Sequence, residues 1–501
     1  MKLAAFHEEP WRTSHEAYRR SALALAPAPE YASSEVVLSS LYRVIGLPEL
    51  IEREVPQNGR DLDKEIQAFR DRKRTRAGAA LEPDALLMLL HSALESPKLP
   101  NQSSKRFLQV TPLVPQAAIF SGAPRLNGSP WSAGNLVRRM VWLGSASPEE
   151  AQVAWEGLFD ALSVSADDDI FARFLQTELA AWRSEPRWSR AAAEEIPALA
   201  PEDRLGLSYP ARQFARDLAP IIAAKAVVTR RQWTSLVEAV LRIAVVAHVA
   251  WILDVQARTW SLVRAALDGA APESVEATRK ALFPRPFSYL SYGDRALPGI
   301  KDRASAYLRA RVGLNAVLWA LEDTHGRVPD TLGSASDVHA LLCEVAASRG
   351  SLVELGLRDT IEEIQERENR TILCSKNIGS NIMEFARHVL GQRQTASSVL
   401  RGYDQGFALR KKSASASSPW IVGLGPVAVL ALVHCSLAGS AGPRSVHRLA
   451  QHLSGYGIAV DYRDIAANDL GHQLRMLGLV LDSPDAESGM LLVPPFAGVS
   501  A

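Results

Sequence analysis

Residues 463–493 read RDIAANDLGHQLRMLGLVLDSPDAESGMLLV, and this stretch decides how the C-terminal part of the chain folds. Its first half, residues 463–477, has apolar side chains at helical spacing, which predicts a helix. The residues on the predicted inner face are Ile465, Leu470, Leu474 and Leu477. Its second half has two short apolar runs, residues 479–481 and 490–493, around a polar turn that contains Pro, Asp and Gly. Such runs predict a β-hairpin directly after the helix.

Two further helices are expected before this stretch, at residues 425–437 and 445–453, with a short extended piece at residues 458–460. Three helices followed by a hairpin resemble the winged helix-turn-helix superfamily, over about residues 419–496. The resemblance implies that the third helix lies in the major groove of duplex DNA, with its outward side chains on bases and phosphates. The DNA-binding residues that it implies are Asn468, His472, Gln473 and Arg475.

The charge of this segment does not favour DNA by itself. Residues 419–501 hold four arginines against six acidic side chains, a net charge of −2. A free-standing DNA-binding module is expected to be basic, because neutralised phosphates supply most of the non-specific affinity. Two interpretations therefore stay open at this point, a winged helix that contacts DNA and a winged helix that contacts protein.

Two basic segments could supply the missing charge. The first crowds the end of a predicted helix and the second leads into the C-terminal segment, where it could hold the DNA backbone while the third helix reads a groove. The residues of the first are Arg70, Arg72, Lys73, Arg74 and Arg76. Those of the second are Arg393, Arg401, Arg410, Lys411 and Lys412. The alternative is that both are ordinary solvated helix ends.

The rest of the chain predicts a mainly α, multidomain protein, since apolar residues recur at helical spacing before residue 455. The longest predicted helix covers residues 230–267. We expect an N-terminal helical region at residues 1–130, a central helical body at 131–410, a flexible linker at 411–418 and a winged-helix-like domain at 419–501.

Composition indicates a cytoplasmic protein outside the membrane. The 501 residues hold 56 Lys and Arg against 55 Asp and Glu, which excludes binding of nucleic acid by bulk charge alone. The three cysteines form no C-x-x-C motif, and the apolar run at the N-terminus is too short for a signal-peptide core. Residues 236–253 and 421–438 are apolar but interrupted, so both are expected to be buried core helices.

No catalytic, cofactor-binding or metal-binding residue is predicted. Residues 423–428 match G-x-G-x-x-A but lack the βαβ context and the acidic residue that a dinucleotide site needs. His447 and His452 have no acid between them at metal-ligand spacing. Asp167, Asp168 and Asp169 are expected to begin a helix, where the dipole favours negative charge.

The sequence thus predicts a non-catalytic DNA-engaging or adaptor subunit of a larger assembly. A helical body with a C-terminal winged helix looks like accessory proteins encoded beside prokaryotic anti-phage defence enzymes. The expected partners are duplex DNA and other proteins. One alternative is a pure protein scaffold, and another is an unfamiliar enzyme with its site in the irregular segment at residues 288–295.

Overall fold

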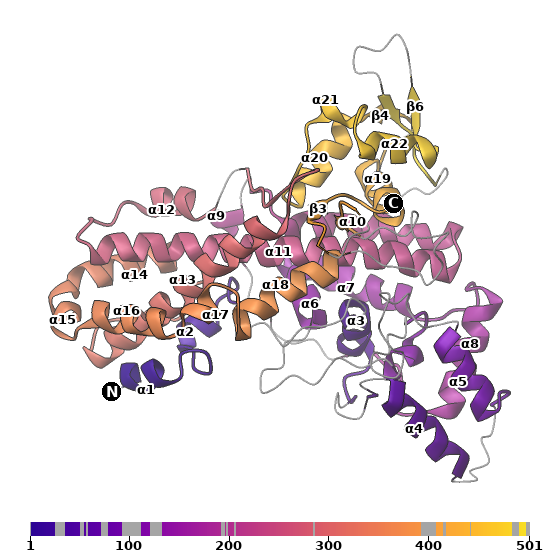
Figure 1. Cartoon of the computed structure of the whole chain (residues 1–501), viewed down its shortest axis with the longest axis horizontal. Coiled ribbons are helices and arrows are strands. Elements are labelled where there is room, and N and C mark those ends of the chain that lie inside the picture. The colour runs from indigo at the N-terminus through magenta and orange to yellow at the C-terminus, as the bar shows by residue number, and fades with distance from the viewer. Residues whose placement is uncertain are drawn as a thin grey trace.

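The chain folds mainly into α-helices, which confirms the predicted class. The structure is a computed structural model. It describes residues 2–25, 36–50, 55–56, 59–71, 79–92, 112–120, 133–191, 196, 199–204, 207–283, 286–391, 407–413, 417–440, 442–482 and 490–496. One long helix, α11 (Arg230–Leu267), crosses the middle of the molecule, with helices at both ends and the C-terminal elements on one side (Figure 1).

α11 is the core of the fold. It begins at a capping box, in which the Thr229 side chain accepts from the backbone N–H of Gln232 and the Gln232 side chain bonds back to the backbone of Thr229. Among the described helices α11 alone is long and apolar enough to cross a membrane, and its most apolar window is wholly buried inside the protein. The prediction that residues 236–253 form a buried core helix is therefore confirmed.

Most of the elements that precede α11 pack at one end of the molecule and beneath its middle. The exceptions are α1 and α2, which lie against α13 (Leu297–Asp323), and α9, whose Asp203 binds Arg279 and the backbone of Ala335. α10 contacts α6, α7 and α11, while α8 lies on η2. The elements are α1 (Lys2–Glu8), α2 (Glu16–Arg19), α3 (Val36–Gly46), α4 (Gly59–Asp71), α5 (Pro83–Ser92), η2 (Pro115–Ile119), α6 (Ala133–Gly144), α7 (Pro148–Leu162), α8 (Ile170–Trp182), α9 (Pro201–Arg204), α10 (Pro210–Ala224) and η3 (Lys225–Val227).

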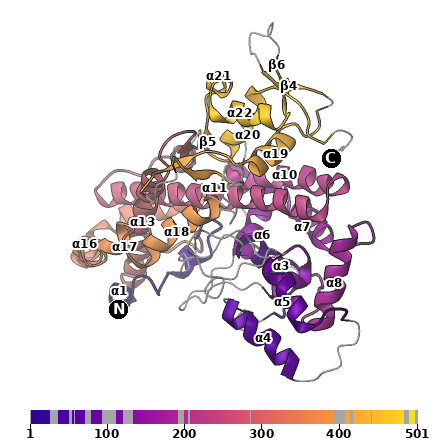
Figure 2. The same cartoon turned by 45° about the vertical axis from the view of Figure 1, so that its right-hand side comes forward.

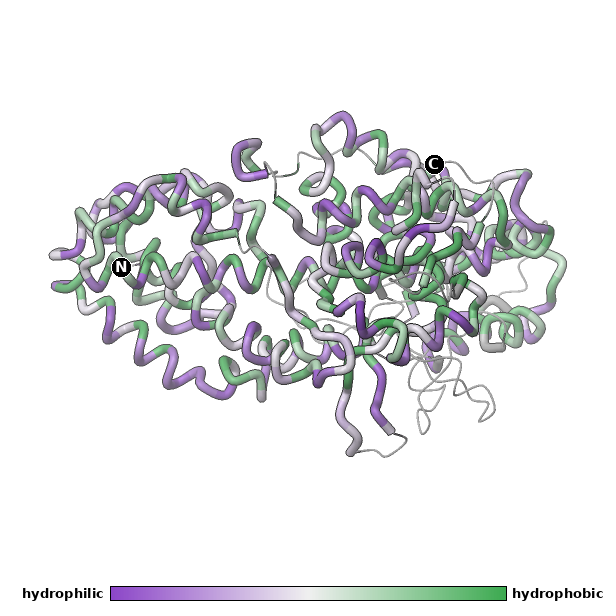
Figure 3. Tube along the Cα trace, turned by 90° about the horizontal axis from the view of Figure 1, so that it is seen from above, coloured by the Kyte–Doolittle hydropathy of each residue, from purple (hydrophilic) through white to green (hydrophobic). Residues whose placement is uncertain are grey.

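The helices after α11 form the other end of the molecule. α13 packs lengthwise on α11, and the shorter helices cover this pair. Apolar and polar residues alternate along the helices in Figure 3, as expected where one face is buried and the other solvated. These helices are α12 (Val275–Leu282), α14 (Ala335–Ala347), α15 (Arg349–Glu354), α16 (Leu357–Arg367), α17 (Asn369–Ile372) and α18 (Asn377–Leu390).

The C-terminal elements lie over α10 and α11 (Figure 2). β6 and β7 form the predicted hairpin, and β4 adds a third strand in the antiparallel order β4-β7-β6. β2 pairs with β3 in a second hairpin. The elements are β2 (Leu409–Lys411), β3 (Trp420–Val422), α19 (Pro426–Ser436), β4 (Arg444–Ser445), α20 (His447–Gly455), β5 (Ile458–Ala459), α21 (Tyr462–Ile465), α22 (Asp469–Met476), β6 (Val480–Asp482) and β7 (Met490–Leu492).

The third helix of this segment differs from its prediction. One helix was expected over residues 463–477, but the chain forms α21 and α22 with a break between them. Asn468 sits in the break and caps α22, accepting from the backbone N–H groups of Leu470 and Gly471 at 2.9 and 3.2 Å. Asparagine at an N-cap stabilises the start of a new helix, so the chain changes direction at this point. The apolar residues keep their helical spacing across the break, which is why the sequence predicted one helix.

The C-terminal elements also contact the body directly. β5 pairs in parallel with β1 (Leu290–Ser291), which precedes α13 in the body. Gly457, beside β5, has φ +70°, and a Cβ there would overlap the rings of Phe287 and Tyr289. Only glycine permits this close approach. Lys411, the first residue of the predicted linker, lies in β2, and residues 414–416 lie outside the described residues; the domain boundaries stay predictions.

Candidate functional site

Half of the predicted DNA-binding residues fall where the structure describes little or nothing. Arg70 lies in the last turn of α4, a helix that the structure describes through Asp71. The residues outside the described part of the chain are Arg72, Lys73, Arg74, Arg76, Arg393 and Arg401. DNA contact by these residues stays a prediction.

The remaining seven candidates lie in or beside β2 and α22, and one contact links the two elements. The link is an ion pair between Arg410 Nη2 of β2 and Asp469 Oδ2 of α22, at 3.0 Å. Gln473 Nε2 donates to the same carboxylate oxygen at 3.1 Å. The basic strand and the third helix are therefore joined through Asp469. The seven are Arg410, Lys411, Lys412, Asn468, His472, Gln473 and Arg475.

The backbone of the β2–β3 hairpin sets the direction of its cations. Arg410 stands opposite Ile421 in the ladder, and a Cβ on Gly423 would lie 2.7 Å from Arg410 Nε. Glycine at position 423 thus lets the arginine lie across the strand toward α22. Lys411 lies over the ring of Trp420, with Nζ 5.9 Å from the ring centroid, while Lys412 is exposed. Arg410 and Lys411 are thus engaged within the protein, whereas Lys412 extends into solvent.

The predicted base-contacting residues of α22 divide into two kinds. The side chains of Asn468 and Gln473 make the cap and the carboxylate contact described above. His472 and Arg475 are exposed, and Arg475 Nη1 donates to the carbonyl of Ala466 at 3.0 Å. The outward face of α22 thus presents one imidazole and one guanidinium.

An exposed apolar surface at the end of α22 was not predicted. Met476 is 67% exposed, Leu477 38% and Leu481, on β6, 53%. We call these three residues the α22–β6 apolar surface. The prediction that Leu477 lies on the inner face of the helix is wrong, because the helical segment ends at Met476 and the chain turns outward through Gly478 at φ +66°. Adjacent apolar residues at positions 476 and 477 were a sequence signal for this exposed surface, since one face of a helix cannot bury both.

The segment at residues 288–295, the candidate enzyme site, is a seam between the body and the C-terminal elements. The backbone N–H of Tyr292 donates to Ala459 O and that of Gly293 to Val422 O, both at 2.9 Å. Burial raises the pKa of Tyr289, and burial together with Asp469 raises the pKa of Tyr292. Both phenols stay protonated at neutral pH, and their surroundings hold the two parts of the chain together.

A buried polar joint, missed in the sequence, fastens α20 to α10. Asp217 Oδ2 accepts from Tyr456 Oη at 2.6 Å and lies 3.0 Å from His452 Nε2. Gln213 Nε2 donates to Asp217 Oδ1 at 3.0 Å and lies 3.2 Å from His452 Nδ1. The imidazole thus lies between the Gln213 amide and the Asp217 carboxylate, and these contacts position α20 on α10. The pair Gln213 and Asp217 lies 239 residues before the pair His452 and Tyr456, so spacing in the sequence could not reveal the joint.

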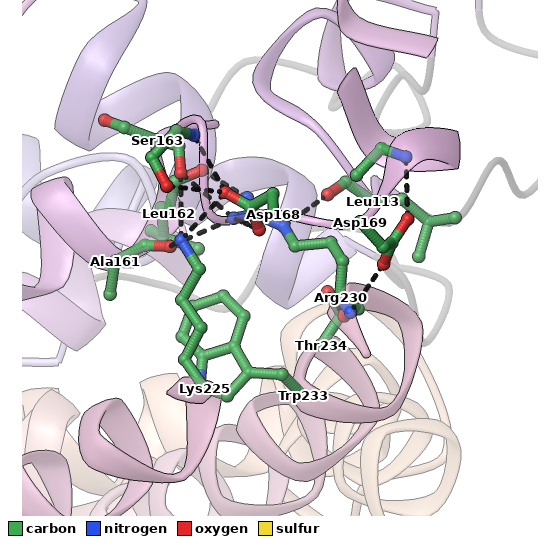
Figure 4. Close-up of polar contacts among 12 residues, drawn as sticks. Leu113, Ala161, Leu162, Ser163, Asp168, Asp169, Lys225, Arg230, Trp233 and Thr234 are labelled. Carbon is green, nitrogen blue, oxygen red and sulfur yellow. Dashed lines mark hydrogen bonds and ion pairs between the residues drawn. The ribbon is translucent and has the colours of Figure 1, made fainter. Parts of the chain in front are cut away.

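A second buried cluster lies where α11 begins (Figure 4). Arg230 and Asp168 have side chains 1% and 2% exposed and approach to 3.3 Å, and Lys225 Nζ lies 3.2 Å from the same carboxylate. Burial alone would raise the pKa of Asp168, but the backbone N–H of Ser165 and the two cations outweigh it and hold that pKa below its usual range. Asp169 caps α8, which confirms the predicted helix start. This cluster is a structural joint.

Metal ligation finds no support among the described residues, where no three His, Cys, Asp or Glu side chains come together as a metal ion would require. Compared with known proteins, the chain matches no protein-family model and no curated protein.

Proposed function

We propose that the protein is a non-catalytic adaptor subunit whose residues 419–496 form a winged helix that binds a partner protein. The element order supports the winged helix. α19, α20 and the α21–α22 pair precede the β6–β7 hairpin, and β4 completes a small sheet. The two buried polar clusters support a non-catalytic role, since the Asp217 joint and the Asp168 cluster have their polar atoms directed at one another.

The observation that carries the proposal is the α22–β6 apolar surface. Leu481 stands opposite Leu491 in the hairpin, so two leucines share one face of the sheet, and the chain enters this hairpin directly from Met476 and Leu477. An exposed group of large apolar side chains on a small module favours a protein interface. Phosphates would require cations there, yet residues 461–481 hold two arginines against three aspartates.

The test compares three forms of the full-length protein, purified from cells of the source organism and examined by quantitative mass spectrometry. The wild type is expected to retain a partner at stoichiometric amounts. The double variant Met476→Ser with Leu481→Ser should lose it, since both side chains are exposed and their removal leaves the fold intact. Val153→Ser, which changes a residue 71% exposed on α7, is the matched control and should retain it. Equal retention by all three forms, or no stoichiometric partner, contradicts the proposal.

Duplex DNA is the second candidate, favoured by the ion pair between Arg410 and Asp469. This pair joins the strand that leads to exposed Lys412 to the helix that carries exposed His472 and Arg475. If these two elements hold DNA, the affinity of the full-length protein for a 30-base-pair duplex falls steeply with salt. Replacing Lys411 and Lys412 by alanine should then reduce the salt slope by about 0.9 for each phosphate that is no longer neutralised. Binding that is absent or independent of salt excludes this candidate. Membership of an anti-phage assembly stays a prediction from the sequence.

A further inference from the structure

Three arginines of α9 and α10 lie together on the body without a carboxylate partner. Arg212 and Arg216 are one helical turn apart on α10, so they share one face of that helix. Arg204, the last residue of α9, adjoins them, because Arg212 Nη1 donates to the carbonyls of Arg204 and Leu207 at 3.3 and 3.0 Å. Among the described residues, none of the three guanidiniums belongs to an ion pair. We call these three residues the α9–α10 arginine cluster.

The acidic neighbours of the cluster point into the protein and are engaged there. Asp203 precedes its first arginine and Asp217 follows its last, and both are buried. The Asp203 carboxylate binds Arg279 Nε and the backbone N–H of Ala335, both at 2.8 Å. The Asp217 carboxylate is held in the polar joint with α20. Glu202 is the exposed acid of α9, so the two helices present three cations and one anion outside the core.

The positive charge converges on a small area at the start of α10. Burial raises the pKa of the Tyr209 phenol, and all three arginines of the cluster oppose that rise. Tyr209 is also the N-cap residue of α10, and no described side chain caps this helix start, where the dipole is positive. Cations one turn apart on a helix repel each other. A bound anion would remove this repulsion.

The extent of the cluster fits a compact anion. At 1.5 Å of rise per residue, Arg212 and Arg216 stand about 6 Å apart along α10. The next exposed position on that face is Ala219, so the cationic surface of α10 ends after Arg216. Guanidinium groups bind phosphate oxygens through paired N–H donors. Two or three linked phosphate groups therefore match the cluster better than the extended backbone of a duplex, whose charge continues along its whole length.

We propose that the α9–α10 arginine cluster binds the phosphate chain of a small polyphosphate compound, either an inorganic polyphosphate or a nucleoside triphosphate. The phosphate oxygens accept from the guanidiniums of Arg212 and Arg216, and Arg204 completes the site at the start of α10. This site lies on the body and goes beyond the binding of a partner protein. Because α10 also carries the joint to α20, a bound ligand stabilises the part of the body that holds the C-terminal elements.

Calorimetric titration of the full-length protein with tripolyphosphate at low salt tests the site. We expect a dissociation constant of about 10 μM for the wild type. Arg216→Glu should raise it by about 100-fold, because it removes one guanidinium and places an acid beside the phosphates. Arg216 is exposed and donates no hydrogen bond within the described residues, so the variant stays folded, which circular dichroism verifies. Arg309→Glu, at an exposed arginine of α13, makes the same change of charge and should leave the constant unchanged.

A titration with adenosine triphosphate identifies the source of the phosphates. Affinity equal to that of tripolyphosphate shows that the phosphate chain alone is recognised, and higher affinity assigns the site to a nucleotide. Both results support the proposal when Arg216→Glu weakens the binding. The proposal is overturned if neither compound binds at about 1 mM, or if Arg216→Glu binds like Arg309→Glu. A DNA duplex that Arg216→Glu binds less tightly, with no binding of either small compound, would assign the cluster to DNA and also overturn it.

Discussion

Replacing Arg230 tests whether the buried cluster of Figure 4 holds α8 on the body. Arg230 is the first residue of α11, and its guanidinium reaches three parts of the chain at once. Nε donates to Leu113 O at 2.8 Å, Nη1 to Ser163 O at 3.0 Å and Nη2 to Tyr42 Oη at 3.1 Å. Arg230→Met keeps most of the apolar stem and removes every one of these donors.

The expected cost follows from what the change leaves behind. Lys225 continues to serve the carbonyls of Ala161 and Ser163, at 2.9 and 3.1 Å, and the carboxylate of Asp168. The carbonyl of Leu113 loses the donor described above, and Leu162 O loses its bond to Arg230 Nη2. Two buried carbonyls without donors, together with a weakened ion pair, should lower the free energy of local opening by about 3 to 5 kcal/mol.

Hydrogen exchange measured by mass spectrometry reports this opening directly. A loss of this size increases the opening equilibrium by about 10² to 5 × 10³ in peptides covering residues 161–182 and 225–240. The matched control is Arg264→Met on the same helix, where the side chain is 72% exposed and lies 4.0 Å from Asp268. This control should change exchange by less than about 1 kcal/mol. If Arg230→Met exchanges like the control, the cluster does not anchor α8 to the body.

Two further predictions concern the seam and the core. Gly457→Ala should lower the free energy of unfolding, measured by urea denaturation, by clearly more than Gly478→Ala. Both glycines have positive φ, +70° and +66°, but only at position 457 would the new Cβ overlap aromatic rings. Gly478→Ala, the control, should lower the free energy of unfolding by only about 1 to 2 kcal/mol, the energy of a left-handed backbone conformation. Equal decreases for the two variants would refute the close approach at Gly457. Burial, with Arg139, lowers the pKa of His248 to about 3. As the pH falls below 6.5, this histidine is therefore protonated in the unfolded chain but stays neutral in the folded chain, and the folded state loses stability. His248→Leu should therefore remove about 2 kcal/mol of the stability loss between pH 7 and pH 5, and an unchanged pH dependence would count against it.

Periodicity predicted the parts of the fold that local sequence governs. Residues 230–267 form one helix as expected, because the helical spacing persists and Thr229 and Gln232 begin it with a capping box. The hairpin at β6 and β7 was also predicted from two apolar runs around a turn. The break before α22 was missed, since Asn468 was interpreted as an outward side chain when its carboxamide caps the helix. A cap and an outward polar residue look alike in a single sequence.

The candidate site was predicted only in outline. Adjacency in sequence suggested that the segment ending at Lys412 lies near the third helix, and the ion pair between Arg410 and Asp469 brings them together. The sequence could not show that Arg410 is held in this ion pair, because Arg410 and Asp469 are 59 positions apart. The joint at Asp217 was missed for the same reason, because His452 lies on α20 and Tyr456, 239 residues from Asp217, directly follows that helix. Long-range polar contacts have no period to reveal them.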